Sequence, residues 1–174
     1  MTVWVSSDYH LNHKNIIKYC NRPFDSVDRM NKVIIRNHNR VVKNDDTWIF
    51  LGDFALTSAN KTEQFLKKLN GYKIIVTGNH DKSPERMKEL GFNEAYKSMY
   101  IYEGKILSHV PVYIEGRLNM NVSVDNWQFY PIPMPRVKYI NLCGHSHNNW
   151  VLRFMTDKKE KYNFTWDKKY QKGW

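Results

Sequence analysis

Histidine, aspartate and asparagine side chains recur in five short clusters, each directly after a short apolar run. The clusters are Asp8-x-His10, Gly52-Asp53, Gly78-Asn79-His80-Asp81, His109 and Gly144-His145-x-His147. Neutral imidazoles, carboxylates and amides are ligands for divalent transition metals, and one carboxylate can bridge two ions that lie about 3.5 to 4 Å apart. On an extended backbone, an Asp-x-His or His-x-His pair has both side chains on one side. These residue types therefore suit a pair of metal ions.

Each cluster alone has an ordinary explanation. Asp8 would serve as a helix cap, Asp53 as part of a turn, and His109 as a buried structural histidine. The word Gly-Asn-His-Asp is more specific, because a given four-letter word occurs by chance in roughly one chain of this size in a thousand. All five clusters in one chain, each at the end of an apolar run, favour a shared site.

The elements expected to position these clusters alternate between strand and helix. The predicted strands are Val3–Val5, Trp48–Leu51 and Tyr72–Val76. The predicted helices run from Asp25 or Ser26 to Val41, from Asn60 to Leu69 and from Pro84 to Leu90. Such alternation indicates a parallel α/β layer, in which functional groups collect beyond the carboxyl ends of the strands. We therefore expect the clusters to meet at one edge of a sheet.

The second half of the chain has a different pattern. It predicts a tight hairpin around Glu103-Gly104, a strand over Val137–Leu142, and a last hairpin of two strands across a charged turn. The first hairpin comprises Ser98–Tyr102 and Lys105–Ser108, and the last one Val151–Thr156 and Tyr162–Trp166. Residues 111–135 carry no clear pattern.

Length and composition predict a single domain over residues 1–174. Hydrophobic residues make up 41% of the chain, and 6 Trp, 11 Tyr and 8 Phe supply a packed core. The start of the chain has no signal-peptide pattern and no run reaches membrane-spanning length, so we expect a soluble, cytoplasmic protein with no membrane partner. Cys20 and Cys143 lie far apart, which favours two free thiols.

The chain is basic, with 27 Lys and Arg against 17 Asp and Glu and a net charge of +10. Positive charge favours anionic partners such as a nucleotide or a nucleic acid, although it also has the simpler role of keeping a domain soluble. Lysines are concentrated near the C-terminus, where they could contact a nucleic acid. Neither reading carries information about the oligomeric state.

Taken in order, the five clusters resemble the signature of the calcineurin-like metallophosphoesterase superfamily, and the short chain resembles its small phosphodiesterase branch. The resemblance covers residues 8 to 147, and all five blocks match without substitution. It implies an α/β fold of four layers, α/β/β/α, with two mixed sheets flanked by helices. One segment departs from this pattern: 121–127 resembles a strand that follows the Gly-His-x-His block in small relatives, so it is either a rearranged strand or a substrate-facing loop.

The resemblance also implies a ligand set. Asp8, His10 and His147 would hold one ion, Asn79, His109 and His145 the other, and Asp53 would bridge them. Mn²⁺ is the expected metal, with Fe, Zn²⁺, Ni²⁺ or Co²⁺ as substitutes. His80 would be a catalytic acid beside the phosphate, hydrogen-bonded to Asp81, which would fix its orientation.

The implied activity is hydrolysis of phosphodiester, or monoester, bonds in nucleotide-type substrates by hydroxide shared between two metal ions. His13 and Arg22 are candidate contacts to the substrate phosphate, because imidazole and guanidinium groups suit an anion. Each also has a structural alternative, as a solvent-facing histidine and as an ordinary ion-pair residue. The competing functions are a nuclease that cleaves polynucleotide and a binding module that metal ions stabilise without catalysis.

Overall fold

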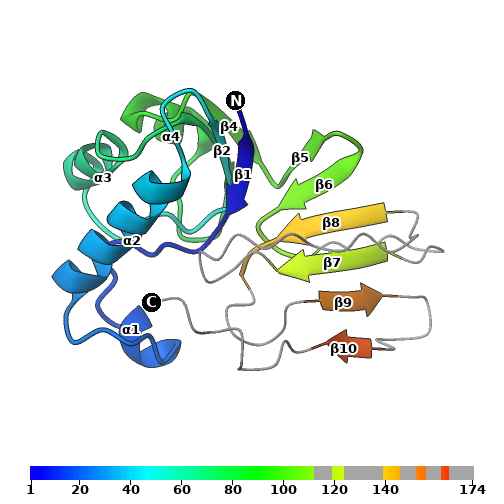
Figure 1. Ribbon diagram of the computed structural model, residues 1–174, viewed down its shortest axis with the longest axis horizontal. Helices are drawn as coiled ribbons and strands as arrows, with labels where there is room; N and C mark the ends of the chain where they lie inside the picture. Colours follow the sequence, from blue (N-terminus) through cyan, green and yellow to red (C-terminus); the bar gives the residue numbers. More distant parts are fainter. Residues whose placement is uncertain (112–118, 124–138, 146–151, 156–161, 165–174) are drawn as a thin grey trace.

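The computed structural model describes residues 1–111, 119–123, 139–145, 152–155 and 162–164, which form two β-sheets with helices beside one of them (Figure 1). The helices of these residues are α1 (Ile16–Tyr19), α2 (Val27–Val41), α3 (Ala59–Leu66) and α4 (Pro84–Leu90). Ser26, Ser58 and Ser83 cap the last three, each accepting a backbone N–H bond three residues on. None of the described helices has the length and apolarity needed to span a bilayer.

Within the described ranges the first sheet contains four strands in their chain order, and every neighbouring pair is parallel. Its strands are β1 (Val3–Ser6), β2 (Thr47–Phe50), β3 (Tyr72–Thr77) and β4 (Glu94–Lys97). Among the described strands this sheet is parallel throughout, whereas both sheets were expected to be mixed. A helix lies between each consecutive pair of strands, and such crossovers join parallel strands.

The two faces of this sheet bury two different cores. Trp48, Phe50 and Ile75 face the helices and pack in the larger core cluster with residues of α2, α3 and α4. Ile49 and Val76, on the opposite face, pack against Leu107 of the second sheet. Because side chains alternate along a strand, a short apolar run can serve both cores.

The second sheet is mixed and lies on the side of the first sheet away from the helices (Figure 1). Its strands are β5 (Met99–Tyr102), β6 (Lys105–Ser108), β7 (Asn119–Ser123), β8 (Tyr139–Cys143), β9 (Leu152–Met155) and β10 (Tyr162–Phe164). Their order is β10-β9-β7-β8-β6-β5, and β8 pairs in parallel with both β7 and β6.

The predicted α/β fold of two packed sheets with flanking helices is confirmed. The hairpin of β5 and β6 is also confirmed, and Glu103 and Gly104 at its turn both have positive φ, as a two-residue hairpin turn of this hand requires. Of the two readings of 121–127, the strand holds for its first residues, which belong to β7 between β8 and β9. All helices of the described ranges lie beside the first sheet, and these ranges contain no helix against the second sheet, so the expected second helical layer is not found among them.

Candidate metal centre

Residues of all five predicted clusters are brought together where strands β1, β2, β3, β6 and β8 end. The backbone N–H of Asp8 donates to the carbonyl of Gly52 at 2.9 Å, and that of His10 donates to the carbonyl of Asp53 at 3.0 Å. On the second sheet, the N–H of Gly144 donates to the carbonyl of His109 at 2.8 Å. Backbone hydrogen bonds alone thus hold neighbouring loops together in pairs.

The loop after β1 is not the extended segment that the sequence predicted. Asp8, His10 and Asn12 have φ of 54°, 49° and 63°, so every second residue is left-handed. A non-glycine residue in this region costs of order 1 to 3 kcal/mol and persists only where its surroundings hold it. The side chains of Asp8 and His10 therefore converge through backbone turns rather than through strand alternation.

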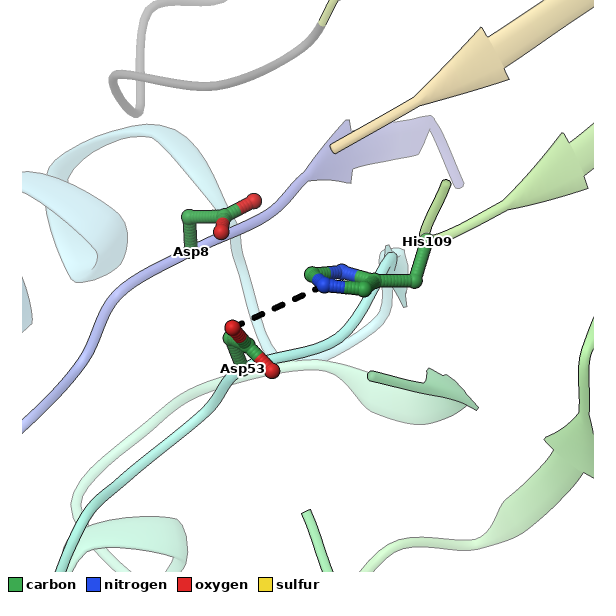
Figure 2. Close-up of side chains that lie close together, drawn as sticks. All are labelled: Asp8, Asp53 and His109. Atoms are coloured by element: carbon green, nitrogen blue, oxygen red, sulfur yellow. Dashed lines mark ion pairs between the residues drawn. The ribbon is translucent and has the colours of Figure 1, made fainter. Parts of the chain in front are cut away.

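Asp8, Asp53 and His109 form the centre of the site. Each offers one ligand atom, and these atoms lie within 4.8 Å of one another. Figure 2 shows the three side chains gathered where the loops after β1, β2 and β6 meet, with a dashed line between Asp53 Oδ2 and His109 Nε2, which lie 3.5 Å apart. All three are buried, which lowers the local dielectric and strengthens their interaction with a cation.

His109 is oriented for metal binding by its second ring nitrogen. A carbonyl oxygen can only accept, so Nδ1 carries the proton and donates to the carbonyl of Leu51 at 2.8 Å. The remaining Nε2 lone pair faces Asn79 Oδ1 at 2.9 Å and Asp53 Oδ2 at 3.5 Å. Lone pairs that converge in this way favour a positive charge among them, and a ligating histidine commonly donates its other N–H to a carbonyl.

His10 approaches the same carboxylate from the opposite loop. Its Nε2 lies 3.5 Å from Asp8 Oδ1 and 3.5 Å from Asp53 Oδ2. Burial, together with the positive charge of nearby Arg22, lowers its pKa to about 3 against the opposing effect of Asp53. The ring is therefore neutral at physiological pH, which is the form that binds metal.

His145 joins the two sheets at the centre. Its backbone N–H donates to Asp8 Oδ2 at 2.9 Å, and its Nδ1 lies 3.2 Å from His109 Nε2. The last predicted ligand, His147, lies outside the described residues. Of the seven predicted metal ligands, the described part of the chain brings six into one cluster of mutual contacts: Asp8, His10, Asp53, Asn79, His109 and His145.

Two glycines permit this close packing of loops. A Cβ at Gly78 would overlap Asp53 Oδ1, and a Cβ at Gly144 would overlap Asp8 Oδ2 and lie 2.9 Å from the carbonyl of Leu51. Any larger residue would push a carboxylate out of place. Gly78 and Gly144 are thus required because the neighbouring carboxylates leave no room for a Cβ atom.

His80 lies at the rim of the centre. Its side chain is 44% exposed, and its Nε2 is 3.9 Å from Asp53 Oδ2. Its backbone N–H donates to Asp53 Oδ1 at 2.9 Å. The imidazole is thus free to meet a molecule from solvent while its own backbone helps to orient Asp53.

Asp81 does not form the predicted hydrogen bond to the ring of His80. Its Oδ2 accepts from the N–H of Asp53 at 2.7 Å and of Gly78 at 2.9 Å, and its Oδ1 from the N–H of Phe54 at 2.9 Å. Burial raises its pKa, while these backbone bonds act in the opposite direction. Two of these donors, Asp53 and Phe54, lie in the loop after β2, so the carboxylate connects that loop to its own loop after β3.

The two predicted substrate contacts have different surroundings. His13 is half-buried, and its Nδ1 lies 3.4 Å from His10 Nδ1 at the edge of the centre. Arg22 is only 8% exposed, and its guanidinium donates to the carbonyls of Asp8 and Tyr9. Arg22 therefore contacts the protein's own backbone, and its predicted contact with substrate stays a prediction.

Sequence reasoning assigned no role to Asn12, which is a hub of the first loop. Its N–H donates to Asn31 Oδ1 at 2.9 Å, its Nδ2 to Thr57 Oγ1 at 3.1 Å, and its Oδ1 accepts from Lys61 Nζ at 2.7 Å. The available signal was the residue type, since asparagine tolerates positive φ better than most residues do.

Comparison with known proteins agrees with this geometry. The family model described as calcineurin-like phosphoesterase matches residues 1–145. The chain belongs to the calcineurin-like phosphoesterase family. Among family relatives, an uncharacterised protein, MJ1445, of Methanocaldococcus jannaschii is 37% identical, over 76% of this chain and 86% of that one. The crystal structure of a protein of unknown function, AQ665, from Aquifex aeolicus is 36% identical with a TM-score of 0.53, and the match covers 64% of this chain and 62% of the Aquifex chain.

Proposed function

We propose that this calcineurin-like protein hydrolyses phosphate esters, with diesters preferred, at a centre of two divalent ions. The observation that carries the proposal is the position of Asp53 Oδ2, which lies 3.5 Å from Nε2 of His10 and 3.5 Å from Nε2 of His109. One carboxylate oxygen thus faces two imidazoles from different sheets. This is the arrangement a bridging ligand needs.

The residues divide into two ligand groups around Asp53. Asp8 and His10 belong to one group, with His147 as its proposed third member, and the other group consists of Asn79, His109 and His145. Oxygen and imidazole donors without thiolate suit Mn²⁺, with Fe, Zn²⁺, Ni²⁺ or Co²⁺ as substitutes. When bound, such ions lower the pKa of a water molecule and neutralise phosphate charge.

The chain's own groups supply the remaining chemistry. His80, exposed at the rim, is placed to donate a proton to the leaving oxygen, which typically contributes 10²- to 10⁴-fold to a rate. Asp81 keeps the loops that carry Asp53 and His80 together through its backbone bonds. His13, beside His10, is placed to contact a phosphate oxygen.

A nucleotide-type substrate is the finer part of the proposal. The net charge of +10 favours an anionic substrate. Tyr19 of α1 is 73% exposed, and its ring stands edge-on to His13 with centroids 6.2 Å apart. An exposed ring at this position can stack on a nucleobase while the phosphate occupies the centre.

The same charge favours a second candidate, a nuclease acting on polynucleotide in the cytoplasm. Backbone phosphates bind a basic protein through counterion release, so such an activity would weaken steeply with salt. A metal-stabilised binding module is the third candidate. It would need the same ligands but no proton donor, and the exposed His80 argues against it.

The test is a hydrolysis assay of metal-free protein reconstituted with Mn²⁺. We expect turnover of bis(p-nitrophenyl) phosphate exceeding that of p-nitrophenyl phosphate, and loss of activity in Asp53→Asn. Asp25→Asn is the matched control, because Asp25 is an exposed aspartate that pairs with Arg29, away from the metal centre. Cleavage of single-stranded DNA or RNA but of neither small ester would favour the nuclease, and no hydrolysis by a fully metallated protein would contradict catalysis.

A further inference from the structure

Arg22 lies beneath the loop that carries Asp8 and His10, and it has no place in the reaction proposed above. Its Nη2 donates to the carbonyl of Asp8 at 2.7 Å and its Nη1 to the carbonyl of Tyr9 at 2.9 Å. A guanidinium holds its donors in one rigid plane, so it can fix two successive peptide groups at once. These peptides precede Tyr9 and His10.

The loop needs such a constraint. Asp8 and His10 both have positive φ, at 54° and 49°, and non-glycine residues keep such angles only where the surrounding structure holds them. Tyr9, between them, is buried and points into the helical core, where its ring stacks on Trp48 at 5.5 Å between centroids. His10, by contrast, faces the metal centre, with its Nε2 3.5 Å from Asp53 Oδ2, and Asp8 lies beside it, with its Oδ1 3.5 Å from the same Nε2.

Arg22 is itself well anchored. Its backbone N–H donates to the carbonyl of Ile17 at 2.8 Å, and its carbonyl accepts from Phe24 at 2.8 Å. Ile16 of the same turn is buried in the helical core. Nη1 also lies 3.6 Å from the sulfur of Met30 in α2. Contacts with α1 and α2 therefore fix the position of the guanidinium, and the guanidinium in turn fixes the loop that carries Asp8 and His10.

The other end of the loop is held separately. Asn12, at φ 63°, is bound by Asn31 of α2 and by Lys61 of α3. His10 lies between the two clamps. Loss of one clamp leaves the residues nearest to it, Asp8 and His10, to relax toward ordinary backbone conformations.

We propose that Arg22 is a positioning residue for the metal centre, holding Asp8 and His10 in ligating geometry through the carbonyls of Asp8 and Tyr9. The proposal rests on the metal-binding part of the proposed function and not on the hydrolysis of any ester. Groups that orient metal ligands typically contribute 10- to 100-fold to metal affinity.

The experiment measures Mn²⁺ affinity of the full chain by isothermal titration calorimetry, and the visible absorption spectrum with Co²⁺ bound. Arg22→Met keeps the length and apolar stem but removes every donor, and we expect 10- to 100-fold weaker Mn²⁺ binding and an altered Co²⁺ spectrum. Arg22→Lys keeps the charge but not the planar fork, so its affinity should lie between those of Arg22→Met and the wild type.

The control for general destabilisation is Leu66→Ala, which opens a cavity in α3 without touching the loop. We expect it to lower the melting temperature of the metal-free protein and to leave Mn²⁺ affinity unchanged. Wild-type affinity in both Arg22→Lys and Arg22→Met would overturn the proposal. Wild-type affinity in Arg22→Lys alone, when Arg22→Met is unfolded, would overturn it too, as would equal weakening in Leu66→Ala.

Ester hydrolysis is read in a separate arm. A wild type that binds Mn²⁺ tightly yet hydrolyses neither small ester would end the proposed function while leaving the role of Arg22 intact. A hydrolytically active protein whose Arg22 variants bind Mn²⁺ normally would do the reverse.

Discussion

Asp53 divides its two carboxylate oxygens between structure and chemistry. Oδ1 accepts the backbone N–H of His80 at 2.9 Å, and Oδ2 faces the rings of His10 and His109. The bond to Oδ1 fixes the torsion of the carboxylate, so Oδ2 is aimed before any ion arrives. It also places the His80 backbone next to the centre, which leaves the ring at the rim.

The exposed ring of His80 should therefore separate catalysis from metal binding. We expect His80→Ala to lower kcat by about 10² to 10⁴, because the leaving oxygen loses its proton donor. Mn²⁺ affinity and the melting temperature should stay at wild-type values, since the hydrogen bond from its backbone to Asp53 is kept. Steady-state kinetics with metal titration check this, and an unchanged kcat would show that another group protonates the leaving oxygen.

Substitution of Asp81 should instead lower the stability of the fold. Asp81→Ala would leave the N–H groups of Gly78, Asp53 and Phe54 without their acceptor, and each buried unsatisfied donor costs about 1 to 3 kcal/mol. We expect the free energy of unfolding to fall by at least about 2 kcal/mol, with a smaller loss in Asp81→Asn, which keeps one acceptor oxygen. Urea denaturation of metal-free protein measures both. If Asp81 only oriented His80, kcat would fall with no loss of stability.

At this scale the sequence predicted residue types better than contacts. The clusters identified the ligands because glycine and ligand types lie next to one another in the chain. The carboxylate of Asp81 binds the backbone of Asp53, 28 residues away, and the guanidinium of Arg22 binds that of Tyr9, 13 residues away, and no spacing rule predicts such contacts. Burial of Arg22 depends on how α1 packs, which a local pattern does not contain.

Among the elements, the junction of β8 with β1 completes the centre. Gly144 sits where the loop of the second sheet passes over Asp8, with the carbonyl of Leu51 also in reach of any added Cβ. The second sheet contributes His109 and His145, so the centre exists only while this junction is closed. The absence of a side chain at Gly144 is therefore needed for the metal ligands of the two sheets to meet.

We expect Gly144→Ala to separate the loops and weaken Mn²⁺ binding at least about 10-fold, because it displaces the carboxylate of Asp8 from its bond with the His145 backbone. Calorimetric titration with Mn²⁺ tests it. Gly104→Ala is the matched control: its φ is 72°, but an added Cβ there meets no atom within 4 Å. The control should lose about 1 kcal/mol of stability and no metal affinity.

Apolar periodicity was sufficient to predict β1, β2 and β3 and helices α2 and α4, whose bounds agree closely with expectation. It missed β4, because Glu94–Lys97 is an edge strand of the described sheet, with no fully buried residue and no alternating apolar signal. It also extended the third helix to Leu69, whereas α3 ends at Leu66, since Leu69 is buried beyond the helix and resembles a continuation.

Across the whole molecule, a buried series of hydrogen bonds begins behind the loop that carries Asp8 and His10. It runs from Trp48 to the carbonyl of Asn70, at the other end of the first sheet. Trp48 Nε1 donates to Ser6 Oγ at 2.8 Å, and Ser6 Oγ donates to Tyr9 Oη at 3.2 Å. The hydroxyl of Tyr9 lies 3.1 Å from His38 Nδ1, and His38 Nε2 lies 3.0 Å from the carbonyl of Asn70. That carbonyl can only accept, so Nε2 carries the proton and Nδ1 accepts from Tyr9.

In this series of hydrogen bonds every donor points the same way, from Trp48 toward Asn70, and this arrangement fits only a neutral His38 ring. A second proton, on Nδ1, would face the Tyr9 hydroxyl, which would have to reverse. The ring is 2% exposed, and burial, with a smaller effect of Lys73, lowers its pKa to about 4 against the bond to Asn70. In the unfolded chain the histidine titrates near 6.5.

Acid should therefore destabilise the fold through His38. Because the folded pKa is the lower one, the unfolded state binds more protons between about pH 6.5 and 4, so stability is full above that range and falls as the pH drops through it. For a shift of this size, the loss between pH 7 and 5 is about 2 kcal/mol. Urea denaturation of metal-free protein at both pH values measures it.

His38→Gln isolates this effect from other buried histidines, His10 among them. A glutamine amide can still donate to the carbonyl of Asn70 and accept from Tyr9, but it does not titrate. We expect the variant to lose about 2 kcal/mol less than the wild type over the same pH change. An equal loss in both proteins would mean that the hydroxyl of Tyr9 reverses at little cost, and that the hydrogen-bond chain does not set the acid stability of this fold.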